Sequence, residues 1–218
     1  MSNSDESNSS PRDQLLDAAE KLFAQRGVHG VSVRQITDEA GLRLASVNYY
    51  FKTKDGLFRA VLMRRAMCVV DERRSLLHDI NLNANSPEES ILKIVKAIAD
   101  PVYRRAKQGD SSWNAYISLI ANIATTDLGG TDESGMFDAL DEVSLEFVNA
   151  LVQVSSHGDE RKAHHAFQFI TGTVLYTVSN NGRINRLSKG LYRSDEYDEI
   201  YSDMIDYITQ GVIAILVP

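Results

Sequence analysis

The chain has 218 residues, of which 43% are hydrophobic and 24% charged, a composition typical of a folded globular protein with one large or two modest domains. Its apolar run over residues 212–217 is too short to span a bilayer, and the N-terminal residues lack the basic and apolar regions of a secretion signal. The single cysteine, Cys68, excludes an intramolecular disulfide and agrees with a reducing compartment. We therefore expect a cytoplasmic protein that does not bind membranes.

The net charge of −7 is unevenly distributed along the chain. Residues 11–74 carry 12 Lys and Arg against 8 Asp and Glu, whereas residues 75–218 carry 11 against 20. Phosphates attract the first segment and repel the second. The distribution therefore favours contact with nucleic acid through the N-terminal third of the chain.

The chain is expected to begin with a disordered tail, because residues 1–10 are polar, acidic and without apolar anchors. Ser10 and Pro11 then start the first helix with a cap and a proline at the first helical position. Gly27 is expected to end this helix. One apolar stripe follows its length: Leu15, Leu16, Ala19, Leu22 and Phe23.

Two short helices around one glycine are predicted next. Ser32 and Gln35 form a capping box that starts the first of them, and Gly41 provides the left-handed residue that ends it. After a turn of the length found in helix-turn-helix units, the second short helix is expected over residues 44–51. With Val47 and Phe51 among its anchors, several positions are left to face a DNA groove: Leu44, Ala45, Ser46, Asn48 and Tyr49.

Residues 12–62 carry apolar, glycine, aromatic and lysine positions in one register: Phe23 to Gly27, Val33, Ile36, Ala40 to Leu42, Ala45 to Val47, Tyr50, Phe51, Lys54 and Gly56 to Phe58. In this register the segment resembles the tetracycline-repressor-like (TetR) transcriptional regulators. The resemblance implies a three-helix DNA-binding domain over residues 11–57 and a helical ligand-binding and dimerisation domain over residues 58–218. The simpler alternative is a helical hairpin without a role in DNA binding.

The resemblance, together with expected exposure, assigns candidate DNA contacts. Arg34 and Asn48 have the donors and acceptors that suit guanine and adenine, and Leu44 and Ala45 join them as candidates for base edges. Arg43 fits either a base or a phosphate. Phosphate contacts, which fix register without reading sequence, are expected from Ser32, Ser46, Tyr49, Tyr50 and Lys54.

A long helix is expected to follow from Thr53 towards Ile80, where ~27 residues would span ~40 Å. Lys54 lies near its N-terminus, so its charge and the helix end are expected to meet the same phosphate. Four arginines further along are predicted to form a solvated face: Arg64, Arg65, Arg73 and Arg74.

The rest of the chain is predicted to be helices separated by polar breaks. Ser86 starts one helix, and Pro101 is expected to end or kink it near Asp100. A basic loop is expected over residues 183–193, and residues 194–196 are expected to cap the last helix. Helical periodicity predicts further helices near residues 113–123, 136–154, 160–179 and 197–215. No segment alternates as a strand does, so the fold is predicted to be all-α.

Sequence motifs of catalysis are absent. The chain has no glycine-rich phosphate loop, no Cys-x-x-Cys, no His-Glu-x-x-His and no Gly-x-Ser-x-Gly. Neighbouring His164 and His165 point about 100° apart on a helix and do not readily share a metal ion. We therefore expect no enzymatic activity, no cofactor and no metal site.

The second half has more aromatic side chains than a simple scaffold requires. In a helical bundle such residues either form the core or line a ligand cavity. The candidates for a ligand-binding role are Trp113, Tyr116, Met136, Phe137, Phe147, Phe167 and Tyr176.

These observations predict a homodimeric repressor that a small hydrophobic effector releases from a pseudo-palindromic, double-stranded DNA operator. The family resemblance implies dimerisation through the last two long helices. A likeness of residues 167–172 and 176–183 to one branch of the family suggests a fatty-acid-like effector. The alternatives are an activator or ligand-independent DNA-binding protein of the same fold, and a helical enzyme or carrier that contains a helix-turn-helix.

Overall fold

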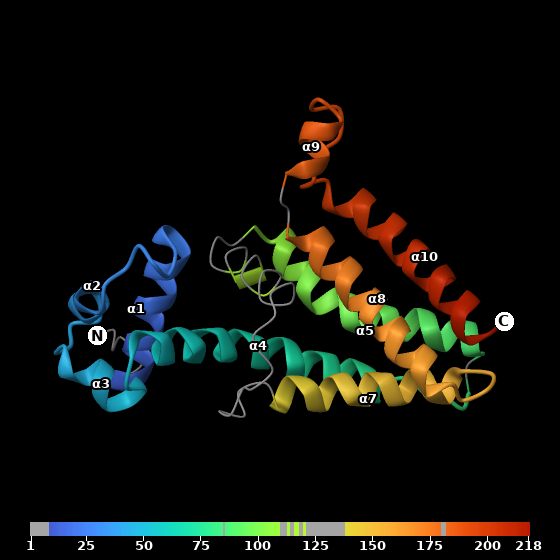
Figure 1. Cartoon of the computed structure of the whole chain (residues 1–218), viewed down its shortest axis with the longest axis horizontal. Coiled ribbons are helices and arrows are strands. Elements are labelled where there is room, and N and C mark those ends of the chain that lie inside the picture. The colour runs from blue at the N-terminus through green and yellow to red at the C-terminus, as the bar shows by residue number, and fades with distance from the viewer. Residues whose placement is uncertain are drawn as a thin grey trace, which may run out of the picture. The chain divides into compact units, whose positions relative to one another are not determined.

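A computed structural model of the chain describes residues 9–84, 86–109, 113, 116–117, 120, 138–179 and 182–218. These residues form helices and no strand, which confirms the predicted all-α fold. Of the predicted tail, residues 1–8 lie outside the described part. In chain order the helices are α1 (Pro11–Arg26), α2 (Val33–Glu39), α3 (Ala45–Phe51), α4 (Lys54–His78), α5 (Pro87–Lys107), α7 (Asp138–Val154), α8 (Glu160–Val178), α9 (Arg183–Leu187) and α10 (Tyr197–Leu216) (Figure 1).

The chain divides into two compact units, Met1–Arg65 and Ala66–Pro218, here called unit 1 and unit 2. Helix α4 contributes its first half to unit 1 and its second half to unit 2. Within the described part of the chain, no helix is both long enough and apolar enough to cross a bilayer.

Unit 1 is built on the apolar stripe of α1. Ser10 caps this helix by accepting a hydrogen bond from the Asp13 backbone N–H at 3.2 Å, and Gly27 ends it with φ +69°. The α1 stripe packs against α2 and α3. The buried core comprises Leu15, Leu16, Ala18, Ala19, Leu22, Phe23, Val31, Ile36, Val47, Phe51, Leu57 and Val61.

Unit 2 has one continuous core between its long helices. Helix α5 packs against α7, α8 and α10, and α8 also packs against α7 and α10 (Figure 1). Ser86 caps α5 and Asp159 caps α8, each by accepting a backbone N–H, at 3.2 and 3.0 Å. Fully buried side chains at helical spacing then fill the centre, among them Ile91, Ile94, Ile98, Phe147, Leu151 and Ile170.

Helix α5 continues through Pro101 to Lys107, so of the two outcomes predicted at this proline, an end or a kink, the end is excluded. Pro101 is buried, and two arginines donate hydrogen bonds to helix carbonyls at and near this residue. Arg73 Nε donates to the Ile98 carbonyl at 3.0 Å, and Arg105 Nη1 donates to the Pro101 carbonyl at 2.6 Å. These donors and the surrounding core stabilise a helix that proline alone disfavours.

The predicted basic loop over residues 183–193 contains a short helix, α9, which begins after the left-handed Gly182. The predicted cap at residues 194–196 is also wrong in detail. Glu196 is the N-cap residue of α10 but makes no side-chain capping bond; its carboxylate accepts instead from the Arg193 backbone N–H at 3.1 Å.

Candidate DNA-binding interface

Helix α2 is fixed at both ends by local chemistry. The Ser32 hydroxyl accepts from the Gln35 N–H at 3.3 Å while the Gln35 side chain accepts from the Ser32 N–H at 2.8 Å, so the predicted capping box is present. Gly41 has φ +67°, and the next residue, Leu42, donates its N–H to the Thr37 carbonyl at 2.9 Å. This C-terminal arrangement needs a left-handed residue, which glycine adopts without strain.

Helix α3 follows the turn with one buried side and one open side. It begins at Ala45, one residue later than predicted, with Leu44 as an N-cap residue that makes no side-chain bond. Val47 and Phe51 are its buried residues and attach it to the core of unit 1. The residues between these anchors are therefore turned away from the core.

The predicted DNA contacts lie mostly on this open side. Leu44 is 60% exposed and Tyr49 74%, and the Arg34 side chain is 85% exposed at the start of α2. Ser46 and Lys54 are half-buried. The remaining candidates are all exposed: Ser32, Arg43, Ala45, Asn48 and Tyr50.

Aromatic contacts order part of this surface. The rings of Tyr49 and Tyr50 meet edge to face with centroids 4.8 Å apart. Tyr50 is 37% exposed, and its ring centroid lies 6.3 Å from that of Phe51. The guanidinium of Arg12 lies 5.4 Å from the Phe51 ring centroid and covers it from the side of α1.

The junction between α3 and α4 brings Lys54 to the same end of the unit. Lys52 has φ +66°, and the Thr53 hydroxyl accepts from the Gly56 N–H at 2.9 Å, which caps α4. A Cβ on Gly56 would lie 2.1 Å from the Phe51 carbonyl oxygen, so the junction requires glycine. The exposed Lys52 was not singled out in the sequence, although it is a cation directly after the recognition helix.

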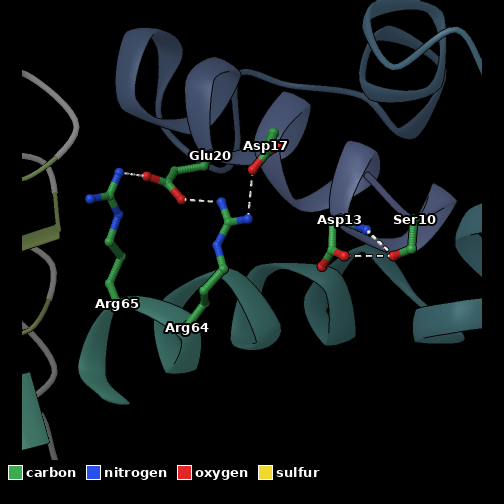
Figure 2. A network of polar contacts seen from close by, with 6 residues as sticks. All are labelled: Ser10, Asp13, Asp17, Glu20, Arg64 and Arg65. Carbon is green, nitrogen blue, oxygen red and sulfur yellow. Dashed lines mark hydrogen bonds and ion pairs between the residues drawn. The ribbon is translucent and has the colours of Figure 1, made fainter. Parts of the chain in front are cut away.

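A charge network joins α1 to α4 within unit 1 (Figure 2). Glu20 is only 8% exposed, and its carboxylate receives both Arg64 and Arg65, while Arg64 Nη1 also lies 2.6 Å from Asp17 Oδ1. The prediction that these two arginines form a solvated face is therefore wrong. They hold the first half of α4 against the helix that supports the helix-turn-helix.

Two family profiles together match most of the chain. Residues 15–61 match "Bacterial regulatory proteins, tetR family", and residues 96–211 match "Tetracyclin repressor-like, C-terminal domain". The chain belongs to the TetR family. It is a DNA-binding transcriptional regulator, and the predicted resemblance is confirmed.

Curated relatives of this TetR regulator agree with the profiles. The HTH-type transcriptional regulator PksA of Bacillus subtilis is 23% identical over 175 residues, which cover 80% of this chain and 82% of PksA. The HTH-type transcriptional regulator BetI of Brucella abortus is 39% identical over 87 residues, which cover 38% of this chain and 40% of BetI.

Solved structures share the fold of the TetR regulator over nearly its whole length. FadR of Bacillus subtilis, solved in complex with stearoyl-CoA, has a TM-score of 0.57 at 16% identity and covers 91% of this chain and 98% of its own. The fatty acid degradation regulator FadR of Bacillus halodurans has a TM-score of 0.59 at 19% identity, with coverages of 94% and 98%.

The predicted ligand-binding residues of the TetR regulator occupy different environments. Phe147 is fully buried in the core of unit 2, and Phe167 is half-buried against it. Trp113 and Tyr116 also pack against that core and meet edge to face at 5.4 Å. Tyr176 is 59% exposed. Met136 and Phe137 lie outside the described residues.

Tyr176 lines a hollow of about 270 Å³ beside Ile184, Leu187 and Ile200, at the junction of α8, α9 and α10. A larger groove of about 530 Å³ runs between α8 and α10. Across the described ranges, no group of three or more His, Cys, Asp or Glu side chains is arranged to hold a metal ion.

Proposed function

We propose that this TetR regulator is a homodimeric repressor that binds a pseudo-palindromic operator and is released from it by a small hydrophobic molecule. The observation that carries the proposal is the open surface of α2 and α3, where Arg34, Leu44 and Asn48 are exposed on a helix-turn-helix anchored from behind. In this proposal these residues and Ala45 read base edges, because the major groove offers distinct donors and acceptors. Phosphates are contacted by Ser32, Ser46, Tyr49, Tyr50 and Lys54, with Arg43 at either kind of contact.

Dimerisation is proposed to occur through α8 and α10, because their shared outer face is apolar and open. Phe169 is 55% exposed and Tyr207 73%, and both line the 530 Å³ groove. Gly172 and Gly211 lie in the same groove, and a Cβ built on either would meet nothing within 4 Å. Small residues between exposed aromatic rings suit a second pair of helices packed closely against the first.

Two copies are needed for specificity, since one seven-residue recognition helix reads few base pairs. Two such helices set about one turn of DNA apart, ~34–36 Å, read the two halves of a pseudo-palindrome. Release then follows from linkage: an effector that prefers the dimer with misplaced recognition helices weakens DNA binding by the same coupling free energy, ~1–3 kcal/mol. Helix α4, which belongs to both units, is the proposed path of coupling.

The effector class is proposed to be fatty-acid-like. FadR of Bacillus subtilis, which shares the fold, was solved in complex with stearoyl-CoA. Unit 2 of this chain also offers half-buried aromatic side chains beside its core, Trp113, Tyr116 and Phe167. Apolar ligands bind in such surroundings with a few polar groups to orient them.

The test is selection of bound fragments from a random DNA pool with the full-length protein. The selected sites are expected to contain two inverted half-sites about one helical turn apart, and addition of fatty acids is expected to lower their affinity. Recovery of no enriched sequence at low ionic strength would exclude the proposal. Transcription from a promoter that contains the selected site, measured with and without the protein, separates repression from activation.

A further inference from the structure

Arg73 occupies a position in α4 where an apolar residue would be expected. Ala66, Val69, Val70 and Leu77 form the buried stripe of the second half of α4, and Arg73 lies three or four residues from its nearest members. The residue is half-buried, and its Nε is hydrogen-bonded to the Ile98 carbonyl on α5. A charged group therefore points into the side of unit 2 on which α4 meets α5.

The Arg73 guanidinium has no carboxylate partner among the described residues. Its Nε donates to the Ile98 carbonyl at 3.0 Å, and no described acceptor is bonded to its two terminal nitrogens. The neighbouring carboxylate, Glu72, is already engaged by Arg104 and by Arg105, whose Nη1 lies 2.6 Å from Glu72 Oε2. Two guanidiniums thus share the Glu72 carboxylate, and the third, that of Arg73, has no ion pair with it.

Burial lowers the pKa of Arg73 to about 10, the nearby Tyr116 opposes the shift, and the adjacent Arg105 adds to it. Arg73 therefore remains protonated at neutral pH, half-buried and without an ion pair to any carboxylate among the described residues. A buried charge of this kind is costly unless it is paired. Groups with such perturbed pKa values are concentrated at functional sites, where a ligand supplies the missing partner.

Aromatic side chains surround the same group of arginines. The Arg105 guanidinium lies 4.8 Å from the Trp113 ring centroid, and Trp113 in turn contacts Tyr116. Tyr116 is close enough to Arg73 to influence its pKa. The guanidiniums therefore form a cationic region directly beside the apolar rings of Trp113 and Tyr116.

We propose that Arg73 binds the carboxylate of a small organic acid whose apolar body lies against Trp113 and Tyr116. This assignment rests on the proposed function, since it specifies the effector as an anion with a hydrophobic tail. A guanidinium presents paired N–H donors that match the two oxygens of a carboxylate. The terminal nitrogens of Arg73 are the donors available for this pairing, because Nε is held by Ile98.

The chain contains a built-in reporter, because Trp113 is its only tryptophan. Full-length protein is titrated with sodium decanoate and with 4-phenylbutyrate while tryptophan fluorescence is recorded. Decanamide and decanol are the neutral counterparts, and decanoyl-CoA tests whether the anion is a free carboxylate or the phosphates of a thioester. Saturable binding of decanoate, about 10- to 100-fold tighter than that of decanamide, is expected from loss of a charge-assisted pair.

Two methionine substitutions on the same helix test the residue. Arg73→Met is expected to weaken decanoate binding by about 10- to 100-fold and to leave decanamide binding nearly unchanged. Arg74→Met is the matched control, because Arg74 is also half-buried but its Nε pairs with Glu146 Oε1 at 2.9 Å. It is expected to bind decanoate like the unsubstituted protein. Arg73→Lys, which keeps the charge, is expected to recover part of the affinity.

Equal affinity of decanoate and decanamide for the unsubstituted protein would overturn the proposal, and this comparison does not depend on any variant folding. So would saturable binding of neither acid, tighter binding of decanoyl-CoA than of decanoate, or unchanged decanoate binding by Arg73→Met. Operator affinity is measured in parallel to separate this inference from the proposed function. Decanoate binding that depends on Arg73 but leaves operator affinity unchanged would refute effector-controlled release and support the Arg73 site. If decanamide releases the operator from both the unsubstituted protein and Arg73→Met, the result would support effector-controlled release and refute the Arg73 site.

Discussion

At the scale of single residues, Arg34 and Lys54 show how two cations of the helix-turn-helix are expected to differ in role. The Arg34 side chain is 85% exposed, and its ion pair within α2 is with Asp38, whose Oδ2 lies 3.9 Å from Arg34 Nε. So weak an exposed pair leaves Arg34 able to turn towards a base. Lys54 is half-buried as the first residue of α4, where the helix N-terminus adds to its attraction for a phosphate.

Alanine at each position is expected to change DNA binding in a different way. Lys54→Ala should weaken all duplexes alike and reduce the dependence of log K on log salt by about one unit. Arg34→Ala should lose ~1–3 kcal/mol of discrimination at one base pair. Fluorescence anisotropy with the selected operator and its single-base variants, over a range of KCl, measures both. Lys93→Ala, which removes an exposed lysine paired with Glu89 in unit 2, is the control; identical behaviour of all three variants would contradict the two roles.

At the scale of elements, the α1–α4 connection depends on a carboxylate that the protein has nearly enclosed. Glu20 receives two guanidiniums whose side chains are themselves 33% and 22% exposed. The pair therefore lies between a surface ion pair, worth ~0–1 kcal/mol, and a buried pair, whose disruption costs ~3–5 kcal/mol. Disruption of the Glu20 ion pairs is therefore expected to lower the free energy of unfolding by an amount between these two limits.

Glu20→Gln, which keeps size and removes charge, is expected to lower the free energy of unfolding by about 1–3 kcal/mol. Glu39→Gln is the matched control, because it breaks the exposed pair with Lys21 and is expected to cost less than ~1 kcal/mol. Urea denaturation followed by circular dichroism gives both values. A similar loss in the two variants would show that Glu20 is no more than a surface charge.

The α5–α10 contact supplies a prediction about pH. The Tyr103 hydroxyl donates to the Tyr197 carbonyl and the Tyr201 hydroxyl donates to Asp100. Burial raises the pKa of Tyr103 and of Tyr201 well above the usual value of about 10. A folded-state pKa above the unfolded value gives stability that is complete below about pH 10 and declines as pH rises further. The free energy of unfolding is therefore expected to fall steadily as the pH rises above about 10, the unperturbed tyrosine pKa.

Tyr201→Phe is expected to reduce that alkaline slope, since phenylalanine has no proton to lose. Tyr192→Phe, at a site 63% exposed, serves as the comparison. Urea denaturation at several pH values yields the slope, and an unchanged slope in Tyr201→Phe would remove this tyrosine as its source.

Elements whose signals are local were predicted well. The capping box of Ser32 and Gln35 and the left-handed Gly41 determine α2 through neighbours in sequence, and the structure has both. The continuation of α5 past Pro101 was not predictable in this way, because its donor, Arg73, lies 25 residues from Ile98 in the chain. The Glu20 network joins residues 44 and 45 positions apart, and periodicity alone left those arginines as solvent-facing charges.

Periodicity predicted that α3 has an open side, because Val47 and Phe51 had to face a core and the residues between them then faced outward. The assignment of that side to DNA came from the family resemblance and stays a prediction. The ligand-binding set was less predictable. Burial of Phe147 and exposure of Tyr176 depend on how α7, α8 and α10 pack, which helical spacing does not specify.

At the scale of the whole molecule, the proposed function ties operator recognition to association of two copies. A stable interface commonly buries about 800 Å² on each partner. The α8–α10 groove offers exposed aromatic side chains next to glycines with open space above them. A large side chain on Gly211 would therefore meet no atom of its own chain but would occupy the space proposed for the partner's helices.

Gly211→Arg is accordingly expected to produce a folded monomer. Its helical content and thermal unfolding should be retained, because arginine favours a helix more than glycine does. Sedimentation equilibrium is expected to give the monomer mass of 24.3 kDa instead of twice that value, and operator affinity should fall by more than tenfold, since one half-site contributes only part of the binding free energy. Leu191→Arg places the same charge at a site that is 77% exposed and outside the groove, and it should remain dimeric. A Gly211→Arg protein that is still dimeric and binds the operator normally would place the interface elsewhere and leave the groove without this role.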